Sequence, residues 1–285
     1  KYRFLAKSSR EQKQYDMAAG YYRKVISYKW DDQKAHFFLG SCLAKARKMG
    51  EAKQAFLQSS RLDSTHLNTN LALTQIYLSA GNADSAHHYL EHVTAKRARK
   101  RFLSLRRDLA DSYRRQERLP EAIAHYQILV EAPDFAAPDR ERAELYRLLA
   151  DLNQILGRAL EGIAWQRRLL ELQDGSEWRS ADRILSLNDM VGLQTAAGAP
   201  EVYETLEELA RLDPDHRYAY SERQVLIATE REDASRRLQG LEGMVRANPD
   251  DIPTLAVLAE LHLKSAAFSQ ADSWLQRGLG VDPRD

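Results

Sequence analysis

Three histidines stand close together in the sequence, and their spacing is compatible with metal chemistry. His87 and His88 are adjacent, and His92 follows His88 by four residues. Residues four apart lie on one face of a helix, so His88 and His92 can share a metal ion. No cysteine or carboxylate cluster nearby completes a coordination sphere, and these positions fall where a helix usually faces solvent. The pattern therefore favours a solvated helix face, and the sequence indicates neither a metal nor a cofactor.

The single cysteine, Cys42, is the next candidate for chemistry. It lies in the apolar run FFLGSCLA, where a small buried hydrophobe is the ordinary interpretation. One cysteine excludes an intramolecular disulfide and a multi-cysteine metal site. The sequence also contains no glycine-rich phosphate loop and no Gly-x-Ser-x-Gly elbow. We therefore expect that the protein is not an enzyme.

Composition is that of a folded chain. Hydrophobic residues make up 44% of the 285 residues and charged residues 29%, with only 13 Gly and 8 Pro. No apolar run approaches the roughly 20 residues that a membrane span needs, so no span is expected. The sequence begins at Lys1, so an N-terminal targeting signal would not be visible, and a cytoplasmic and a periplasmic location stay equally open.

The elements expected throughout are helices. Apolar residues recur at i, i+3, i+4 and i+7, and strand-type alternation is almost absent. A longer period lies over the helical one. Similar residues align when copies begin near 33, 67, 103, 143, 183, 218 and 252, with a partial earlier copy from residue 1, at intervals of about 34, 36, 40, 40, 35 and 34 residues. A period of this size is typical of a solenoid built from helix pairs.

Within each copy, residue size follows a fixed order. Positions seven and eight are large then small, as in Leu39-Gly40 and Leu109-Ala110. Position twenty holds a small residue where paired helices approach closely, in Ala18, Ala52, Ala86, Ala122 and Ala271. Position twenty-four is bulky again, in Tyr22, Phe56, Leu90, Tyr126, Leu206, Leu241 and Leu275. Pro214, Pro249 and Pro283 follow at position thirty-two, where proline stops a helix.

This pattern resembles the tetratricopeptide repeat, and the resemblance covers essentially the whole chain. It implies an all-α fold: a right-handed superhelical α-solenoid of about eight helix-turn-helix repeats, forming a single domain over residues 1–285. We also expect the chain to be part of a longer protein. The copy near 218 carries Arg237 at position twenty, so its register is open by one residue, and the copy near 183 matches weakly. The longer intervals place connectors at 131–141 and 172–182.

The resemblance also implies where a ligand binds. In this family the first helix of each pair lines a concave groove with its positions two, five, nine and twelve. The groove residues carried over to this chain are Lys7, Arg10, Lys34, Phe37, Asn68, Gln75, Arg107, Asp111, Arg114 and Arg147. Such a basic, amide-rich surface suits another protein or an acidic peptide segment. The expected function is a non-enzymatic protein–protein interaction scaffold.

Charge distribution leaves two alternatives open. Residues 1–118 contain 24 Lys and Arg against 11 Asp and Glu, and the remainder contains 18 against 30. Opposed charges and uncapped ends would allow head-to-tail self-assembly into a homo-oligomer. The dense basic stretch 96–118 could also contact nucleic-acid phosphates without sequence preference. Its tyrosines and leucines occupy repeat core positions and leave no stacking platform, so nucleic acid is the weakest of the three interpretations.

Overall fold

The computed structural model describes residues 1–93, 99–132, 138–175 and 178–281. These residues form sixteen α-helices and one short 3-10 helix, with no strand among them. The predicted all-α fold of about eight helix pairs is therefore confirmed. By its internal contacts the chain separates into two compact units, residues 1–136 (unit 1) and 137–285 (unit 2).

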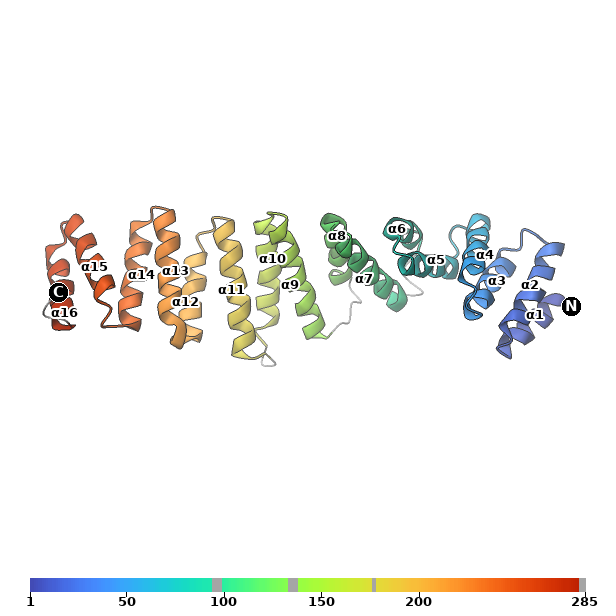
Figure 1. The fold of residues 1–285 in the computed structure, drawn as a ribbon, viewed down its shortest axis with the longest axis horizontal. Coiled ribbons are helices and arrows are strands. Elements are labelled where there is room, and N and C mark those ends of the chain that lie inside the picture. The colour runs from blue at the N-terminus through green and yellow to red at the C-terminus, as the bar shows by residue number, and fades with distance from the viewer. Residues whose placement is uncertain (94–98, 133–137, 176–177, 282–285) are drawn as a thin grey trace. The chain divides into compact units, whose positions relative to one another are not determined.

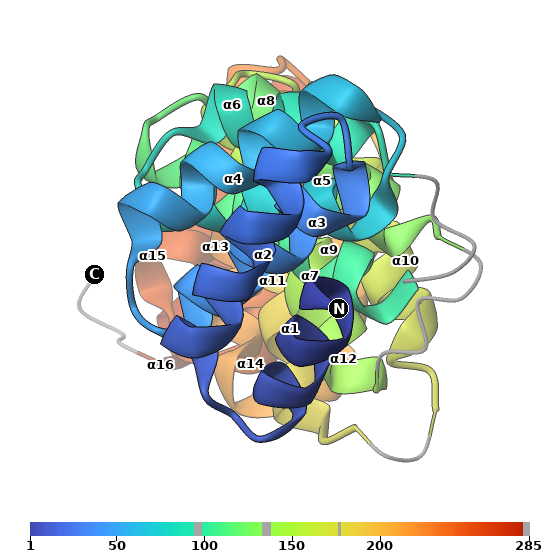
Figure 2. The same ribbon diagram turned by 90° about the vertical axis from the view of Figure 1, so that its right-hand side faces the viewer.

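Unit 1 contains four helix pairs, and each first helix packs against the second helix that follows it. The second helix of each pair also contacts the first helix of the next (Figure 1). Figure 2 looks at the N-terminal end of the unit, where α1, α2 and α3 are neighbours. The pairs are α1 (Tyr2–Glu11) with α2 (Tyr15–Tyr28), α3 (Gln33–Lys45) with α4 (Met49–Leu62), α5 (Leu67–Ser79) with α6 (Ala83–Glu91), and α7 (Arg99–Arg115) with α8 (Leu119–Val130).

Unit 2 repeats this arrangement with four more pairs, and a 3-10 turn at Pro214–His216 separates its second pair from its third. The predicted connectors 131–141 and 172–182 are each too long at the C-terminal end, because α9 already begins at Asp139 and α11 at Ser180. Residues 133–137 and 176–177 of these connectors lie outside the described residues. The pairs are α9 (Asp139–Ile155) with α10 (Ala159–Leu172), α11 (Ser180–Ala196) with α12 (Val202–Leu212), α13 (Arg217–Glu230) with α14 (Ala234–Ala247), and α15 (Ile252–Lys264) with α16 (Phe268–Val281).

The turn inside each pair fixes the register of the repeat. In most copies the residue at position fifteen has a positive φ, which reverses the chain between the two helices. The second helix then begins two residues later, at position seventeen. The copy near 218 follows this rule, with Glu232 in the turn and α14 beginning at Ala234. Its register is therefore not shifted, and Arg237 does occupy position twenty.

The copy near 183 is the one that departs from the common register. Its positive-φ residue is Gly198, one position later than in the other copies. Its second helix α12 begins only at Val202, which is position twenty. The sequence between the two helices, residues 197–201, reads AGAPE, and Pro200 lies just ahead of α12. Counting from 183 therefore misplaces the first half of this copy by one residue.

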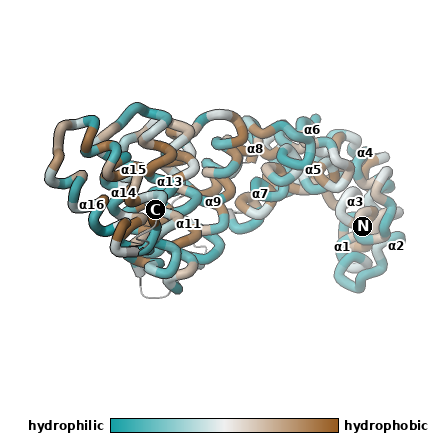
Figure 3. The backbone as a smooth tube through the Cα atoms, turned by 60° about the vertical axis from the view of Figure 1, so that its left-hand side comes forward, coloured by the Kyte–Doolittle hydropathy of each residue, from teal (hydrophilic) through white to brown (hydrophobic). Residues whose placement is uncertain are grey.

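Burial follows the predicted order of residue sizes. The five alanines at position twenty are between 0% and 1% exposed. The bulky residues at position twenty-four are also buried in most copies, for example Phe56 and Tyr126. Figure 3 shows hydrophobic and hydrophilic residues alternating along individual helices, as helices buried on one side require. The core of each unit is thus a continuous row of contacts between successive pairs.

Gly40, at position eight of its copy, shows how close the paired helices come. A Cβ atom added at Gly40 would lie 2.8 Å from two ring carbons of Phe56 on α4. Phe56 is buried among other side chains and has little room to move. A glycine is therefore required at this point because the Phe56 ring packs directly on the α3 backbone.

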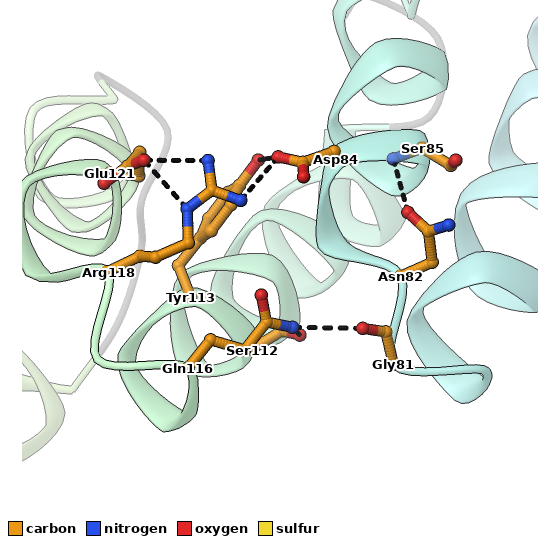
Figure 4. A network of polar contacts seen from close by, with 9 residues as sticks. All are labelled: Gly81, Asn82, Asp84, Ser85, Ser112, Tyr113, Gln116, Arg118 and Glu121. Carbon is orange, nitrogen blue, oxygen red and sulfur yellow. Dashed lines mark hydrogen bonds and ion pairs between the residues drawn. The ribbon is translucent and has the colours of Figure 1, made fainter.

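A polar network joins the third and fourth pairs of unit 1 (Figure 4). Arg118 donates to Asp84 at 2.7 Å and to Glu121 at 2.9 Å, and the Tyr113 hydroxyl donates to Asp84 at 3.3 Å. The Gln116 amide donates to the backbone carbonyl of Gly81 at 3.0 Å. These contacts tie the start of α6 to the turn between α7 and α8.

A second polar cluster lies buried at the same junction. The Arg106 side chain is only 6% exposed and donates to Glu91 at 3.2 Å and to Nδ1 of His125 at 3.1 Å. The His125 ring stacks on Tyr113 and meets His87 edge-on. Burial, and then the Arg106 charge, lower the pKa of His125 to about 4. His125 is therefore neutral at neutral pH and accepts a hydrogen bond from Arg106.

Replacing Gly40 by Ala should destabilise unit 1. The added methyl group overlaps the buried Phe56 ring, and overpacking of this kind typically costs about 1–3 kcal/mol in free energy of unfolding. Gly20→Ala is the matched control, because Gly20 also lies inside a helix but a Cβ atom added there would meet nothing within 4 Å. Urea unfolding should show a lower midpoint for Gly40→Ala and an unchanged or higher one for Gly20→Ala. Equal midpoints would contradict the close contact.

Acidification should weaken the fold through His125. The folded-state pKa of about 4 lies below the ordinary 6.5, so the unfolded chain binds the proton first. The contribution of His125 is complete above about pH 6.5 and is lost as the pH falls toward 4, by up to about 3 kcal/mol. Urea unfolding across this range should show a shallower pH slope for His125→Gln than for wild type. His88→Gln, on the exposed side of α6, should keep the wild-type slope, and equal slopes in all three proteins would refute the assignment.

Candidate interaction surface

Four basic side chains meet at a pocket of about 300 Å³ in unit 1, here called the N-terminal pocket. Arg3, Lys7 and Arg10 reach it from α1, and Lys34 reaches it from the first turn of α3. Lys7 and Arg10 are one turn apart on their helix, which places them on one side of it. The remaining lining comes from Tyr22, Asp32, Ala35 and Phe38. Three of the predicted groove residues, Lys7, Arg10 and Lys34, are thus brought together.

The four basic groups of the N-terminal pocket differ in how far their charge is already engaged. Arg3 forms an ion pair with Asp32, whose other oxygen caps α3 by accepting from the Ala35 backbone N–H at 3.2 Å. The Arg10 guanidinium lies over the Phe38 ring, 4.2 Å from its centre. Lys7 has only a long, solvent-exposed contact to Glu11 at 3.9 Å. The pocket therefore combines an apolar floor with cations at its rim.

A second, smaller pocket of about 200 Å³ lies between the first helices α5 and α7. Gln75 and Asp111, both predicted groove residues, line it together with Asp108 and Arg115. The Asp111 carboxylate accepts a hydrogen bond from the Tyr126 hydroxyl and lies 3.9 Å from Arg114. Burial, and then the nearby Asp111, raise the pKa of Asp108. This pocket is acidic, in contrast to the N-terminal pocket.

The other predicted groove residues lie elsewhere. Phe37 packs into an aromatic cluster, with its ring 5.9 Å from Phe56 and 5.0 Å from His66. Asn68 is exposed on α5 and lines neither pocket, while Arg107 and Arg114 lie on α7. Arg147 belongs to unit 2, where it donates to the Ser186 hydroxyl at 3.4 Å and lies 3.9 Å from Asp189.

The basic stretch 96–118 is less available to phosphates than its composition suggests. Residues 96–98 lie outside the described part of the chain. Among the others, Arg106 is buried against Glu91 and His125, and Arg118 is paired with Asp84 and Glu121. Internal contacts therefore engage at least these two arginines of the basic stretch.

The three histidines first considered for chemistry do not share one exposed face. His87 is partly buried, with its ring edge-on to Tyr113 and His125, so the prediction that it faces solvent is wrong, whereas His88 and His92 are exposed. The rings of His88 and His92 are 4.9 Å apart, but Nδ1 of His92 is 2.7 Å from the His88 carbonyl oxygen. No group of three or more His, Cys, Asp or Glu side chains in the described residues is arranged to hold a metal ion. Cys42 is fully buried, and burial raises the pKa of its thiol. Within the same residues, no helix is both long and apolar enough to cross a bilayer.

Comparison with known families decides the identity of the repeat. The sequence profile described as tetratricopeptide repeat matches residues 5–65, 71–137 and 107–177, which together make up more than half of the chain. The chain belongs to the tetratricopeptide repeat family. Members of this family generally serve as protein–protein interaction modules and are typically non-enzymatic.

Several solved tetratricopeptide structures are similar to this chain at low identity. The TPR domain of P58(IPK) is 13% identical over 100% of this chain and 93% of its own, with a TM-score of 0.34. The C-terminal part of a TPR repeat-containing protein from Cytophaga hutchinsonii is 12% identical over 90% and 98%, with a TM-score of 0.41. YrrB, described as a TPR protein with an unusual peptide-binding site, is 13% identical over 82% and 95%, with a TM-score of 0.35. A search of curated proteins gives no match.

Part of the N-terminal pocket was not predicted from the sequence. Phe37 of the adjacent Phe37-Phe38 pair was the predicted groove residue, but it is Phe38 that lines the pocket beneath Arg10. Asp32, which both caps α3 and pairs with Arg3, was not among the predicted residues. An N-cap signal was present, since Asp32 directly precedes the apolar run of α3. The ion pair with Arg3 depends on tertiary contact and has no local signal.

Proposed function

We propose that this protein is a non-enzymatic interaction scaffold that holds an acidic segment of a partner protein in the N-terminal pocket of unit 1. The observation that carries the proposal is the convergence of Arg3, Lys7, Arg10 and Lys34 from two first helices on one cavity. The family resemblance places ligands on first helices, and both α1 and α3 are first helices. Carboxylates of the partner would form charge-assisted hydrogen bonds with the lysines.

The apolar floor of the pocket adds to this proposal. Phe38 and Tyr22 stack at 5.6 Å, and both line the cavity. An acidic segment that also carries an apolar side chain would bury that side chain against these rings while its carboxylates meet the rim. Binding would then have one component that salt weakens and another that salt does not weaken.

Reversing the charge at the rim should abolish most of this binding. We expect Lys7→Glu with Lys34→Glu to weaken a fluorescein-labelled Glu-rich peptide containing one Leu by at least about tenfold, measured by anisotropy at low salt. Lys24→Glu with Lys29→Glu is the matched control, since both lysines are exposed, change the net charge equally and lie outside the pocket. Equal loss in the two double variants would show that only net charge matters and would refute the site.

Self-association is a second candidate function, favoured by the opposite net charges of residues 1–118 and 119–285. Position twenty-four is buried in the other copies, as in Leu90 and Leu241, whereas Leu275 on α16 is 45% exposed. Leu275 lines a small apolar pocket of about 110 Å³ with Trp274, Leu279 and residues of α15. A helix of another subunit would cover this surface, and the opposite charges of the two halves of the chain would favour head-to-tail contact.

Sedimentation at low and high salt tests this second function. Self-association through opposed charges should give a mass that at least doubles at low salt and returns to the monomer at high salt. Leu275→Glu should keep the chain monomeric at low salt, whereas Leu160→Glu, at an exposed leucine of α10, should not. A monomer under both salt conditions would refute self-association without affecting the N-terminal pocket.

A further inference from the structure

A cavity of about 550 Å³ lies in unit 2, framed by the second helices α12 and α14 and floored by the first helix α13. It is distinct from the N-terminal pocket, which lies in unit 1 and takes its basic groups from first helices. Its volume is in the range of ordinary ligand sites. No part of the proposed function uses it.

Two glycines on α14 set this helix pair apart from the others. In the six other copies whose second helix begins at position seventeen, position twenty-six carries Lys24, Gln58, His92, Ile128, Arg168 and Arg277. In α14 this position is Gly243, where an added Cβ would lie 2.5 Å from the Ser221 hydroxyl oxygen. Position twenty-three is aromatic or Ala in those six copies, but it is Gly240 here, and its added Cβ would lie 2.8 Å from Val225.

These glycines shape the wall of the cavity. Because α14 carries no side chain at either position, its backbone packs directly on α13. The cavity wall at Gly243 is therefore main chain, next to the Ser221 hydroxyl. Any larger residue at position 243 would displace Ser221 and occupy the cavity. Glycine is unfavourable inside a helix, so Gly240 and Gly243 lower the helix propensity of α14 while they allow it to pack closely on α13.

The charged groups of the cavity are sorted along the helices. Glu204 and Glu207 lie in the first half of α12, and Arg211 lies in its last turn. Arg246 is in the last turn of α14, and Arg217 begins α13, which runs back from the end of α12. The cavity therefore has an arginine end and a glutamate end.

Some of these charges are already engaged and others are not. Glu207 accepts from Gln239 at 2.6 Å and lies 3.5 Å from Arg236, while Arg217 donates to the Ala210 carbonyl at 3.4 Å. Arg211 and Glu204 are exposed, and neither makes an ion pair within the described residues. Seven residues of helix separate them, about 10 Å at 1.5 Å per residue.

We propose that this cavity binds a short extended peptide segment of the pattern acidic-x-x-basic. A short extended segment in the polyproline II conformation has three residues per turn and advances about 3.1 Å per residue, so side chains three residues apart lie on the same side and span about 9 Å, close to the roughly 10 Å between Glu204 and Arg211. The acidic side chain meets Arg211, Arg217 and Arg246, and the basic side chain meets Glu204. This is a second interaction surface, framed by second helices and selective for charge order.

The test uses a labelled probe, acetyl-Asp-Gly-Gly-Lys-amide, and the full chain carrying Lys7→Glu and Lys34→Glu, so that binding at the N-terminal pocket is silent. We expect saturable binding in the millimolar range or tighter, and at least about tenfold weaker binding of the neutral probe acetyl-Asn-Gly-Gly-Gln-amide. Equal binding of the two probes, or no saturable binding of the charged probe, would overturn the proposal.

Single substitutions locate the binding. Arg211→Glu and Glu204→Lys should each weaken the charged probe at least about fivefold, whereas Arg167→Glu, an exposed arginine of α10, should leave it unchanged. Gly243→Leu should abolish binding by filling the cavity. Should circular dichroism show that Gly243→Leu does not fold, the two charge reversals decide alone. Wild-type affinity in both charge reversals would place the peptide elsewhere and refute the site.

Discussion

The fold depends on the close approach of the two helices within each pair. Alanine at position twenty lets the second helix lie against the first, and a bulky residue four positions later fills the space around this contact, as Phe56 does on α3 and Tyr22 does against Phe38 of the following pair. A single pair buries only one of its sides, so each pair needs its neighbours for stability. This explains why Phe56 packs on the α3 backbone at Gly40 and why the same sizes return at a fixed spacing along the chain.

Such a fold can be predicted well from sequence because its signals are local and repeated. The turn residues, the alanines and the prolines after second helices all lie within one copy, and eight copies reinforce the pattern. Prediction from sequence fails for side chains whose burial or orientation depends on contacts between neighbouring helix pairs. Arg106 appears in the sequence as one of many basic residues, but Glu91 and His125, on the helices to either side of α7, bury it. Phe37 and Phe38 are adjacent, and only packing determines which ring faces the pocket.

Residues that depart from the repeat pattern show how the packing of one helix pair differs from that of the others. Arg237 at position twenty suggested a shifted register, yet α14 begins where other second helices begin. The close approach of α13 and α14 is instead made three residues later, at Gly240. The small residue has thus moved along the helix while the contact between the pair is preserved. Gly243, three residues further along, meets Ser221 just as closely, so α14 lies against α13 over this whole stretch and forms one wall of the cavity.

The engagement of the charges in the N-terminal pocket determines how selective it is. Arginine favours planar, bidentate recognition of carboxylates, but Arg3 is held by Asp32 and Arg10 lies on the Phe38 ring. The cations left at the rim, Lys7 and Lys34, are compact charges on flexible side chains. A lysine ammonium group can meet a carboxylate from many directions, so such a pocket would recognise the charge of a segment more than its detailed geometry. If the pocket holds an acidic segment as proposed, selectivity for a particular partner would come from the apolar floor, where Phe38 and Tyr22 would limit the size of the side chain that fits between the lysines.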